Sequence, residues 1–195
     1  VCVSPDYNSS AIHCDQYLRV HPGTDAVLAL AACRYILDQK LLDEAYVKEQ
    51  TDLPLLVRRD TSRFLRASDL NQNAPDPEAV FYVWDGSSNQ PRAVAGCQGS
   101  EAKTLALGEL DPQLDSEWTV TLADGSNCAV TTVLRRLRDQ LADPLYSLEG
   151  AARHCGIPLN DLTQFVHDFA TRKPAMIIHG AGVNHWYHND LLNRA

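Results

Sequence analysis

Residues 22–37, PGTDAVLALAACRYIL, constrain the fold more than any other stretch of this sequence. A Pro-Gly turn leads into Thr24 and Asp25, and Arg34 is the one charged residue in the apolar run that follows. Thr24 is a good N-cap because its hydroxyl can accept a first-turn N–H, and Asp25 complements the positive end of the helix dipole. Gly23 allows a sharp turn or a close approach to a ligand. The pattern predicts a helix buried on most sides, which is either a plain core helix or the floor of a ligand site.

Composition and charge narrow the class of protein. The 195 residues are 45% hydrophobic and 22% charged, as is usual for a globular domain with a sizeable core. The net charge of −8 argues against a nucleic-acid or anionic-membrane surface. No stretch approaches a transmembrane length, and the start does not resemble a signal peptide. Because the chain begins inside a strand pattern and ends inside a helix pattern, we interpret it as an internal piece of a larger polypeptide.

Hydrophobic periodicity predicts an α/β fold in which strands and helices alternate. We expect a Rossmann-like parallel sheet with flanking helices and a β-rich insert. The predicted division is 1–75 as a cofactor-binding α/β segment, 76–135 as the insert, and 136–195 as an α/β segment that returns to the same domain. The expected elements are a strand at 1–3, a loop at 4–22, helices at 24–39, 41–51 and 134–141, two helices within 147–173, and a buried strand at 174–182 followed by a helix.

Turn signals locate two further features. The stretch at 80–86 reads as a strand that ends in an Asp-Gly turn, and 118–137 reads as a hairpin with its turn at Asp124-Gly125. The two helices of 147–173 divide at Gly156, and Asn160 is a plausible N-cap for the second.

Two strand-to-loop junctions, Ser4–Tyr7 and His179–His185, are the candidate ligand sites, because such loops meet at the carboxyl edge of a parallel sheet. The second junction contains G-x-G but lacks the third glycine of a dinucleotide fingerprint. Its histidines at H-x-x-H spacing lack the glutamate of the usual zinc hydrolase motif, so we expect no metal ligands here. No serine shows a nucleophile elbow. The six cysteines form no C-x-x-C pair, and Cys2 and Cys33 read as buried thiols.

Four stretches carry a resemblance to a known family. The sequence PDYNSSAIHCDQYLRVHPGTDAVLALA resembles the guanine-nucleotide-binding stretch of molybdopterin oxidoreductases of the dimethyl sulfoxide reductase family. The sequences TDLPLLVRRDTSRFLRASDL, LADGSNCAVTTV and MIIHGAGVNHWYHNDL are similar to the branch that contains the respiratory nitrate reductase alpha subunits. The last stretch is the most specific, and the resemblance is weakest in the insert.

The resemblance implies a cofactor, molybdenum held by two molybdopterin guanine dinucleotides. Asp25 would then recognise guanine, since one carboxylate can accept both the ring N–H and the amino group of that base. The remaining cofactor-binding candidates are Asp6 and Tyr7 near the ribose or base, Gly23 and Thr24 at the helix start, and Gly180, Gly182, Asn184 and His185 along the pterin. For each of them a structural role stays open: Asp25 as a helix-start charge, the glycines as turn formers, and His185 as a core histidine.

The resemblance further implies an enzyme whose catalysis depends on more than this chain. The chain shows no molybdenum ligand and no cysteine cluster for an iron–sulfur centre, so we assign it no catalytic or metal-binding residue and expect no activity from it alone. The implied reaction is reduction of nitrate to nitrite by oxygen-atom transfer, in the electron transport of anaerobic respiration. The alternatives are nitrite oxidation, selenate, chlorate or perchlorate reduction, hydrocarbon dehydrogenation, and a non-catalytic nucleotide-binding module.

The implied partners are an iron–sulfur electron-transfer subunit, a membrane or haem subunit, and a small oxyanion substrate. The implied location is a membrane-associated complex, and the side of the membrane stays open.

Overall fold

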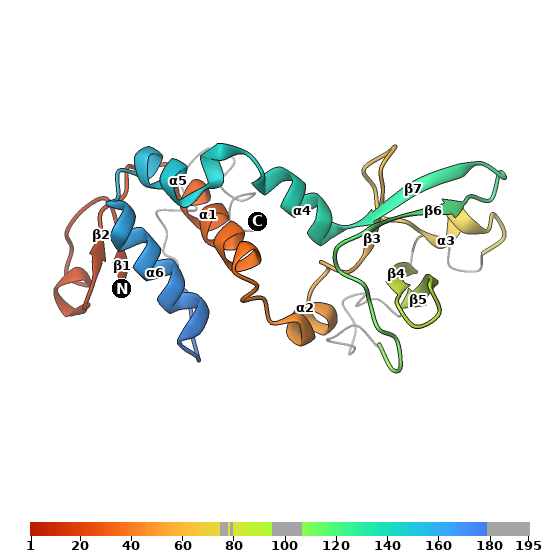
Figure 1. The fold of residues 1–195 in the computed structure, drawn as a ribbon, viewed down its shortest axis with the longest axis horizontal. Helices are drawn as coiled ribbons and strands as arrows, with labels where there is room; N and C mark the ends of the chain where they lie inside the picture. Colours follow the sequence, from red (N-terminus) through yellow and green to blue (C-terminus); the bar gives the residue numbers. More distant parts are fainter. Residues whose placement is uncertain (75–77, 79, 95–106, 179–195) are drawn as a thin grey trace. The chain divides into compact units, whose positions relative to one another are not determined.

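The computed structural model describes residues 1–74, 78, 80–94 and 107–178. These residues form two compact units (Figure 1). The first unit combines Val1–Leu42 with the described part of Gln140–Ala195, and the second is Asp43–Asp139. The predicted division into 1–75, 76–135 and 136–195 stays a prediction.

The first unit is mainly helical. Its elements are strands β1 (Cys2–Val3) and β2 (Tyr17–Leu18), 3-10 helices η1 (Ala11–His13) and η2 (Pro144–Tyr146), and helices α1 (Asp25–Asp38), α5 (Leu148–Cys155) and α6 (Leu159–Thr171). The core joins α1 to α5 and α6, where the small side chains of Ala31 and Ala151 are fully buried and let the helices approach closely. Leu28, Leu162 and Val166 fill the space around them.

Helix α1 confirms the predicted helix, but two details of that prediction are wrong. Leu28, Ala31 and Leu37 are its buried residues, and the rest of the helix stays partly or fully exposed on this unit. The Thr24 hydroxyl accepts no first-turn N–H and instead donates to the His21 carbonyl at 2.7 Å. Cys2 and Cys33, expected to be buried thiols, are only half-buried.

The break between α5 and α6 is confirmed. Gly156 ends α5 with φ +74°, a left-handed conformation that favours glycine, and the Ser147 hydroxyl caps the start of α5 by accepting from Gly150 N. Asn160 is not the N-cap of α6. The cap position is Pro158, whose extended backbone lets the helix begin at Leu159.

The second unit contains the β-rich region. A three-stranded antiparallel sheet has the order β3 (Leu56–Arg58), β7 (Asn127–Thr132), β6 (Glu117–Thr121), and a separate hairpin pairs β4 (Phe81–Asp85) with β5 (Gln90–Val94). The helices are α2 (Glu44–Gln50), α3 (Ala67–Leu70) and α4 (Val133–Leu141). Gly125 forms the predicted turn between β6 and β7 with φ +85°. Helix α2 starts later than predicted, because Asp43 caps it by accepting from Tyr46 N.

The α/β class and the β-rich insert are therefore confirmed, whereas the Rossmann-like sheet is not. Within the described residues, β1 and β2 form the one parallel pair, two residues long in each strand. The strand predicted at 174–182 is absent from 174–178, where Met176 is 79% and Ile178 is 84% exposed. No described strand lies beside this segment to pair with it, and 179–182 lie outside the described residues.

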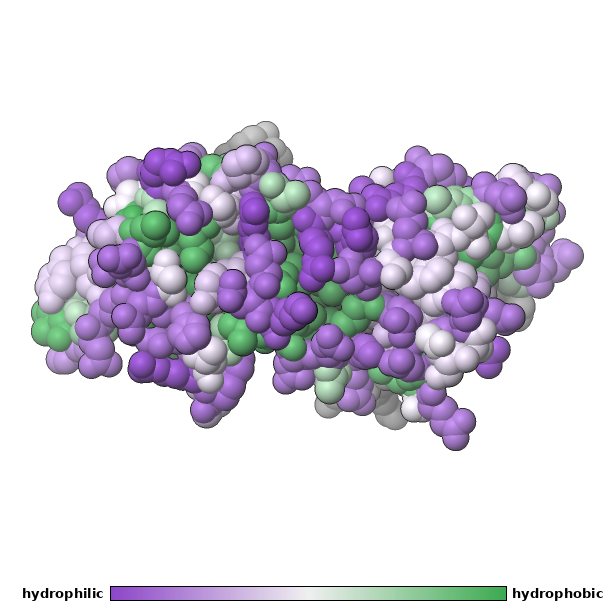
Figure 2. Space-filling model, viewed as in Figure 1, coloured by the Kyte–Doolittle hydropathy of each residue, from purple (hydrophilic) through white to green (hydrophobic). Residues whose placement is uncertain are grey.

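Apolar side chains remain on the surface of the first unit. Figure 2 shows green patches among the purple polar surface over this part of the molecule. The exposed large apolar residues of this unit are Val1, Val3, Tyr7, Ile12, Leu159, Met176, Ile177 and Ile178.

Candidate functional site

The carboxyl ends of β1 and β2 form the edge at which the candidate site lies. The two strands run parallel, with Cys2 opposite Tyr17 and Val3 opposite Leu18. Parallel neighbours end at the same edge, so residues 4–7 after β1 and residues 19–25 after β2 leave from one side. The Ser4 amide donates to the Leu18 carbonyl at 3.1 Å, which continues the pairing to the point where the loops diverge. The structure thus brings two of the predicted groups of site residues to a common edge.

Asp6 and Tyr7 lie in the exposed loop after β1. The Tyr7 ring packs edge-on against the Tyr17 ring at a centroid distance of 5.2 Å, and the Tyr17 hydroxyl donates to the Ser4 carbonyl at 2.9 Å. The loop is therefore tied to β2 through Tyr17. Asp6 is exposed, so its carboxylate is accessible to a ligand.

Gly23 and Thr24 shape the entry to α1. Gly23 has φ +82°, and a Cβ built on it would meet no atom within 4 Å. The glycine is therefore required by the backbone turn and not by crowding. Thr24 is 8% exposed, and its hydroxyl hydrogen is directed to the His21 carbonyl. Thr24 consequently fixes the turn from within.

Asp25 is the first residue of α1 and is half-buried. The first-turn N–H groups of a helix carry partial positive charge, which complements the negative charge of a carboxylate at this position. Among the described residues, no side chain or backbone N–H donates to this carboxylate. It is an acceptor at the start of α1, in the segment that follows β2, and its chemistry fits a ligand that presents two adjacent N–H donors.

The end of α5 holds this turn in place, a support that the sequence analysis missed. The His21 amide donates to the Cys155 carbonyl at 2.8 Å, and the His21 ring nitrogen Nδ1 lies 3.2 Å from the His154 carbonyl. Because a carbonyl only accepts, Nδ1 carries the hydrogen. The Cys155 thiol is directed to the Thr24 carbonyl, 3.6 Å away, and burial raises the pKa of this thiol. These contacts join residues more than 130 positions apart, so no local pattern could reveal them.

Gly156 completes this support. A Cβ at this position would lie 2.4 Å from Nε2 of His21, and the backbone has positive φ. Both the conformation and the close approach of the His21 ring therefore require glycine. The positive φ was foreseeable from a glycine at a helix end, but the contact with His21 was not.

The remaining predicted site residues, Gly180, Gly182, Asn184 and His185, lie outside the described residues. Their roles along the pterin stay predictions.

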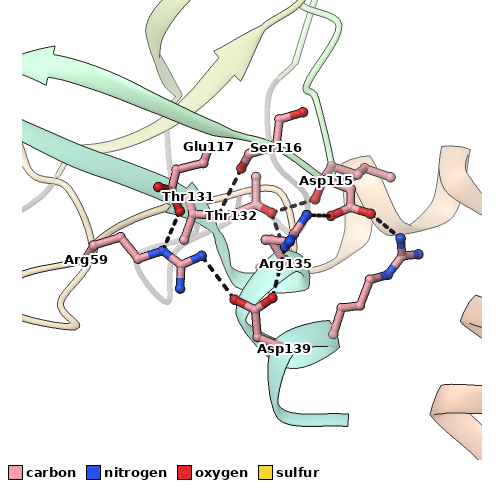
Figure 3. Close-up of polar contacts among 10 residues, drawn as sticks. Arg59, Asp115, Ser116, Glu117, Thr131, Thr132, Arg135 and Asp139 are labelled. Atoms are coloured by element: carbon pink, nitrogen blue, oxygen red, sulfur yellow. Dashed lines mark hydrogen bonds and ion pairs between the residues drawn. The ribbon is translucent and has the colours of Figure 1, made fainter. Parts of the chain in front are cut away.

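The second unit contains a network of ion pairs (Figure 3). Arg59 joins Glu117 of β6 at 2.8 Å to Asp139 of α4 at 3.0 Å, and Arg135 joins Asp139 to Asp115. The Thr131 hydroxyl donates to the Ser116 carbonyl at 2.9 Å. The network fastens α4 to the sheet, and its charges satisfy one another, so its arrangement is structural.

The described residues contain neither a metal-ion cluster nor a membrane-spanning helix. In that part of the chain, no group of three or more His, Cys, Asp or Glu side chains is placed to hold a metal ion. The helices seen there are all too short or too polar to cross a membrane.

Comparison with known proteins identifies relatives along the whole chain, although no family model matches it. The perchlorate reductase subunit alpha of Dechloromonas aromatica is 38% identical over 215 residues, covering 100% of this chain and 23% of the relative. The respiratory nitrate reductase subunit alpha of Haloferax mediterranei is 42% identical over 204 residues, covering 100% and 20%. The dimethylsulfide dehydrogenase subunit alpha of Rhodovulum sulfidophilum is 38% identical over 186 residues, covering 95% and 20%.

The chain is homologous to alpha subunits of the dimethyl sulfoxide reductase family. The resemblance stated from the sequence motifs is thereby confirmed, and it extends through the β-rich insert. The chain spans about a fifth of the length of the curated relatives it matches.

Proposed function

We propose that this chain is a cofactor-binding segment of the catalytic subunit of a molybdenum oxidoreductase. The proposed ligand is the guanine end of molybdopterin guanine dinucleotide, held where β1 and β2 end. The observation that carries the proposal is Asp25: a half-buried carboxylate at the start of α1, with no described donor, in a chain whose relatives are oxidoreductase alpha subunits.

In this proposal each residue has a separate task. Asp25 accepts hydrogen bonds from the ring N–H and the amino N–H of guanine. Gly23 and Thr24 hold the turn that presents Asp25, and His21 links this turn to the end of α5. Asp6 and Tyr7 lie on the neighbouring loop, where a ribose hydroxyl would find an acceptor. Gly180, Gly182, Asn184 and His185 line the pterin.

The bound molybdenum cofactor supplies the redox chemistry, a two-electron oxygen-atom transfer. This chain's residues contribute binding and orientation, as is general for cofactor enzymes. The proposed complex is membrane-associated and contains an iron–sulfur subunit and a membrane or haem subunit. These subunits deliver the electrons, together with an iron–sulfur centre elsewhere in the longer polypeptide.

For the substrate we propose nitrate, reduced to nitrite. The support is the GAGVNHWYH stretch and the 42% identity to a nitrate reductase subunit. The chain is 38% identical to the perchlorate reductase subunit and 36% identical to the chlorate reductase subunit of Ideonella dechloratans. Sequence identity therefore separates nitrate only slightly from perchlorate and chlorate as the substrate. Assays of the purified holoenzyme with nitrate, chlorate, perchlorate and selenate decide: a kcat/KM for nitrate below that for another oxyanion overturns this proposal.

Substitution of Asp25 tests the cofactor role. In Asp25→Asn an amide N–H faces the guanine donors, and loss of a hydrogen bond to a charged group costs about 1.5–3 kcal/mol, or roughly 10- to 100-fold in affinity. We expect the full-length variant to lose most of its molybdenum and guanine nucleotide during purification.

The matched control is Asp38→Asn, the same change at the other end of α1, where Asp38 is exposed and pairs with Arg34 at 3.4 Å. Equal cofactor content in the two variants would contradict the role of Asp25. A wild-type protein that retains guanine nucleotide without any molybdenum would favour the non-catalytic nucleotide-binding module.

A further inference from the structure

A cavity of about 520 Å³ lies in the second unit, whereas Asp25 belongs to the first. It opens between the end of β3, the loop that follows it and the start of α3. The lining residues are Val57, Arg58, Thr61, Ser62, Arg63, Phe64, Arg66, Ser68, Asp69 and Glu78. Three of these side chains are arginines, in a protein whose net charge is −8.

Arg66 is the unusual member of this lining. Its Nη1 is shielded from solvent, and no hydrogen-bond acceptor reaches it among the described residues. Buried polar atoms are nearly always paired, and a charged one is especially costly to leave without an acceptor. The guanidinium carbon lies 3.7 Å from the centroid of the Phe81 ring and 5.6 Å from that of Phe64. Stacking on Phe81 holds the group in one place, so it is preorganised for an acceptor.

The two carboxylates that line the cavity bond to groups other than the Arg66 side chain. Asp69 pairs with Arg58 and accepts from the Arg66 amide at 2.8 Å, and Glu78 accepts from the Ser68 hydroxyl at 3.0 Å. Arg58 also pairs with Asp60 at 2.6 Å. Within the part of the chain that the structure describes, the Arg66 side chain has no such carboxylate, and a positive charge is left over.

We propose that this cavity receives a carboxylate-bearing segment from the rest of the longer alpha-subunit polypeptide. The inference rests on the proposed function, under which this chain is one segment of such a subunit. An Asp or Glu side chain that enters the cavity pairs with the positive charge of the Arg66 guanidinium, for which the described residues supply no carboxylate.

Two observations favour a polypeptide over a small free anion. The cavity is several times larger than one oxyanion fills, and Val57 and Phe64 give it apolar walls that an anion does not use but a flanking apolar side chain does. The curated relatives are four to five times as long as this chain, so most of such a polypeptide lies outside it.

Photo-cross-linking of the full-length protein tests the proposal. The probe is p-benzoyl-phenylalanine at Thr61, an exposed residue of the lining, followed by mass spectrometry of the cross-linked peptides. We expect a cross-link to a peptide of the same polypeptide outside residues 1–195 that contains Asp or Glu. Arg66→Met should reduce its yield at least fivefold, whereas Arg66→Lys, which keeps the charge, and Arg92→Met, an exposed arginine of β5, should leave most of it.

Each other result overturns the proposal: a cross-link to a peptide within residues 1–195, to another subunit, to a peptide without an acidic residue, or to no peptide, or a yield that Arg66→Met leaves unchanged. If Arg66→Met does not fold, the wild-type cross-link still decides. The molybdenum content of the same preparation reports separately on the proposed function, so the two proposals can fail independently.

Discussion

Gly156 shows how one residue can be required for two reasons. Its φ of +74° disfavours any side chain, and a Cβ would lie 2.4 Å from the His21 ring. Gly125 in the β6–β7 turn has φ +85° but meets no atom within 4 Å. Comparison of Gly125 with Gly156 therefore separates the effect of conformational strain from that of steric overlap.

Alanine substitution should reveal this difference. We expect Gly125→Ala to cost about 1 kcal/mol of unfolding free energy from strain alone, and Gly156→Ala to cost about 2–4 kcal/mol, because the His21 ring must also move. Gly156→Ala should in addition increase hydrogen exchange at residues 21–25 of the full-length protein. Equal losses for the two variants, with unchanged exchange at 21–25, would show that the contact with His21 is unimportant.

Asp85 carries a prediction about pH. Its buried carboxylate accepts from the Ser88 hydroxyl and from the amides of Ser87, Ser88 and Asp111, and these bonds hold its pKa well below the usual range. A carboxyl group with a lowered folded-state pKa binds fewer protons than in the unfolded chain. Its stabilising contribution is complete above the unfolded pKa of about 4 and disappears as pH falls through the folded value.

We therefore expect Asp85→Asn to increase hydrogen exchange of the β4–β5 hairpin at pH 7, after correction for intrinsic rates. The difference from wild type should shrink as the pH falls below about 4. Asp38→Asn is the control, since that exposed carboxylate lies in the other unit. A difference that stays constant from pH 7 to pH 3 would contradict the assigned cause.

At the scale of single elements, the ion pairs of the second unit differ in expected strength. Arg59, in the loop after β3, pairs with Asp139 of α4, and the two side chains are 34% and 40% exposed. Arg58 and Asp69 are 17% and 18% exposed. Solvent screens the first pair more effectively than the second.

Double-mutant cycles should separate the two pairs. For Arg59→Met with Asp139→Asn we expect a coupling of less than about 1 kcal/mol that falls with added salt. For Arg58→Met with Asp69→Asn we expect a larger coupling with a weaker salt dependence. The reverse order would mean that the network in Figure 3, and not the Arg58 pair, stabilises the sheet.

Elements with strong local signals were the ones that the sequence predicted. The apolar run after Gly23 gave α1, the Asp-Gly turn gave the β6–β7 hairpin, and Gly156 gave the break between α5 and α6. Features that depend on distant contacts were missed or wrong. The Thr24 hydroxyl donates to the His21 carbonyl. Helix α5 supports the turn before α1 through contacts between residues that lie more than 130 positions apart in the sequence.

The same limit applies to the candidate site. Asp25 could be proposed as a site residue because helix-start chemistry and the G-T-D pattern coincide at one position. His21 and Cys155 carry no such pattern, since their importance arises from the packing of α5 against the turn. Arg66 was not distinguishable from other arginines in the sequence, because its missing acceptor is a property of the folded cavity.

At the scale of the whole molecule, the segment Met176–Ile178 is the clearest conflict between sequence and structure. Three consecutive large apolar residues are 79%, 66% and 84% exposed, although their composition is typical of a buried strand. Leaving them in water forgoes the stabilisation that burial of each side chain gives, about 1.5–3 kcal/mol. Since the relatives are four to five times longer than this chain, we predict that a longer polypeptide covers this segment.

Met176 is the only methionine of the chain, so its oxidation reports on this segment alone. We expect that peroxide converts Met176 to the sulfoxide slowly in the full-length protein and at least tenfold faster after unfolding in urea, because burial blocks access to the sulfur. Mass spectrometry of the peptide that contains Met176 measures both rates. An equally fast reaction in the folded protein would mean that the segment is a true surface, and its apolar side chains would then require a partner outside the alpha subunit.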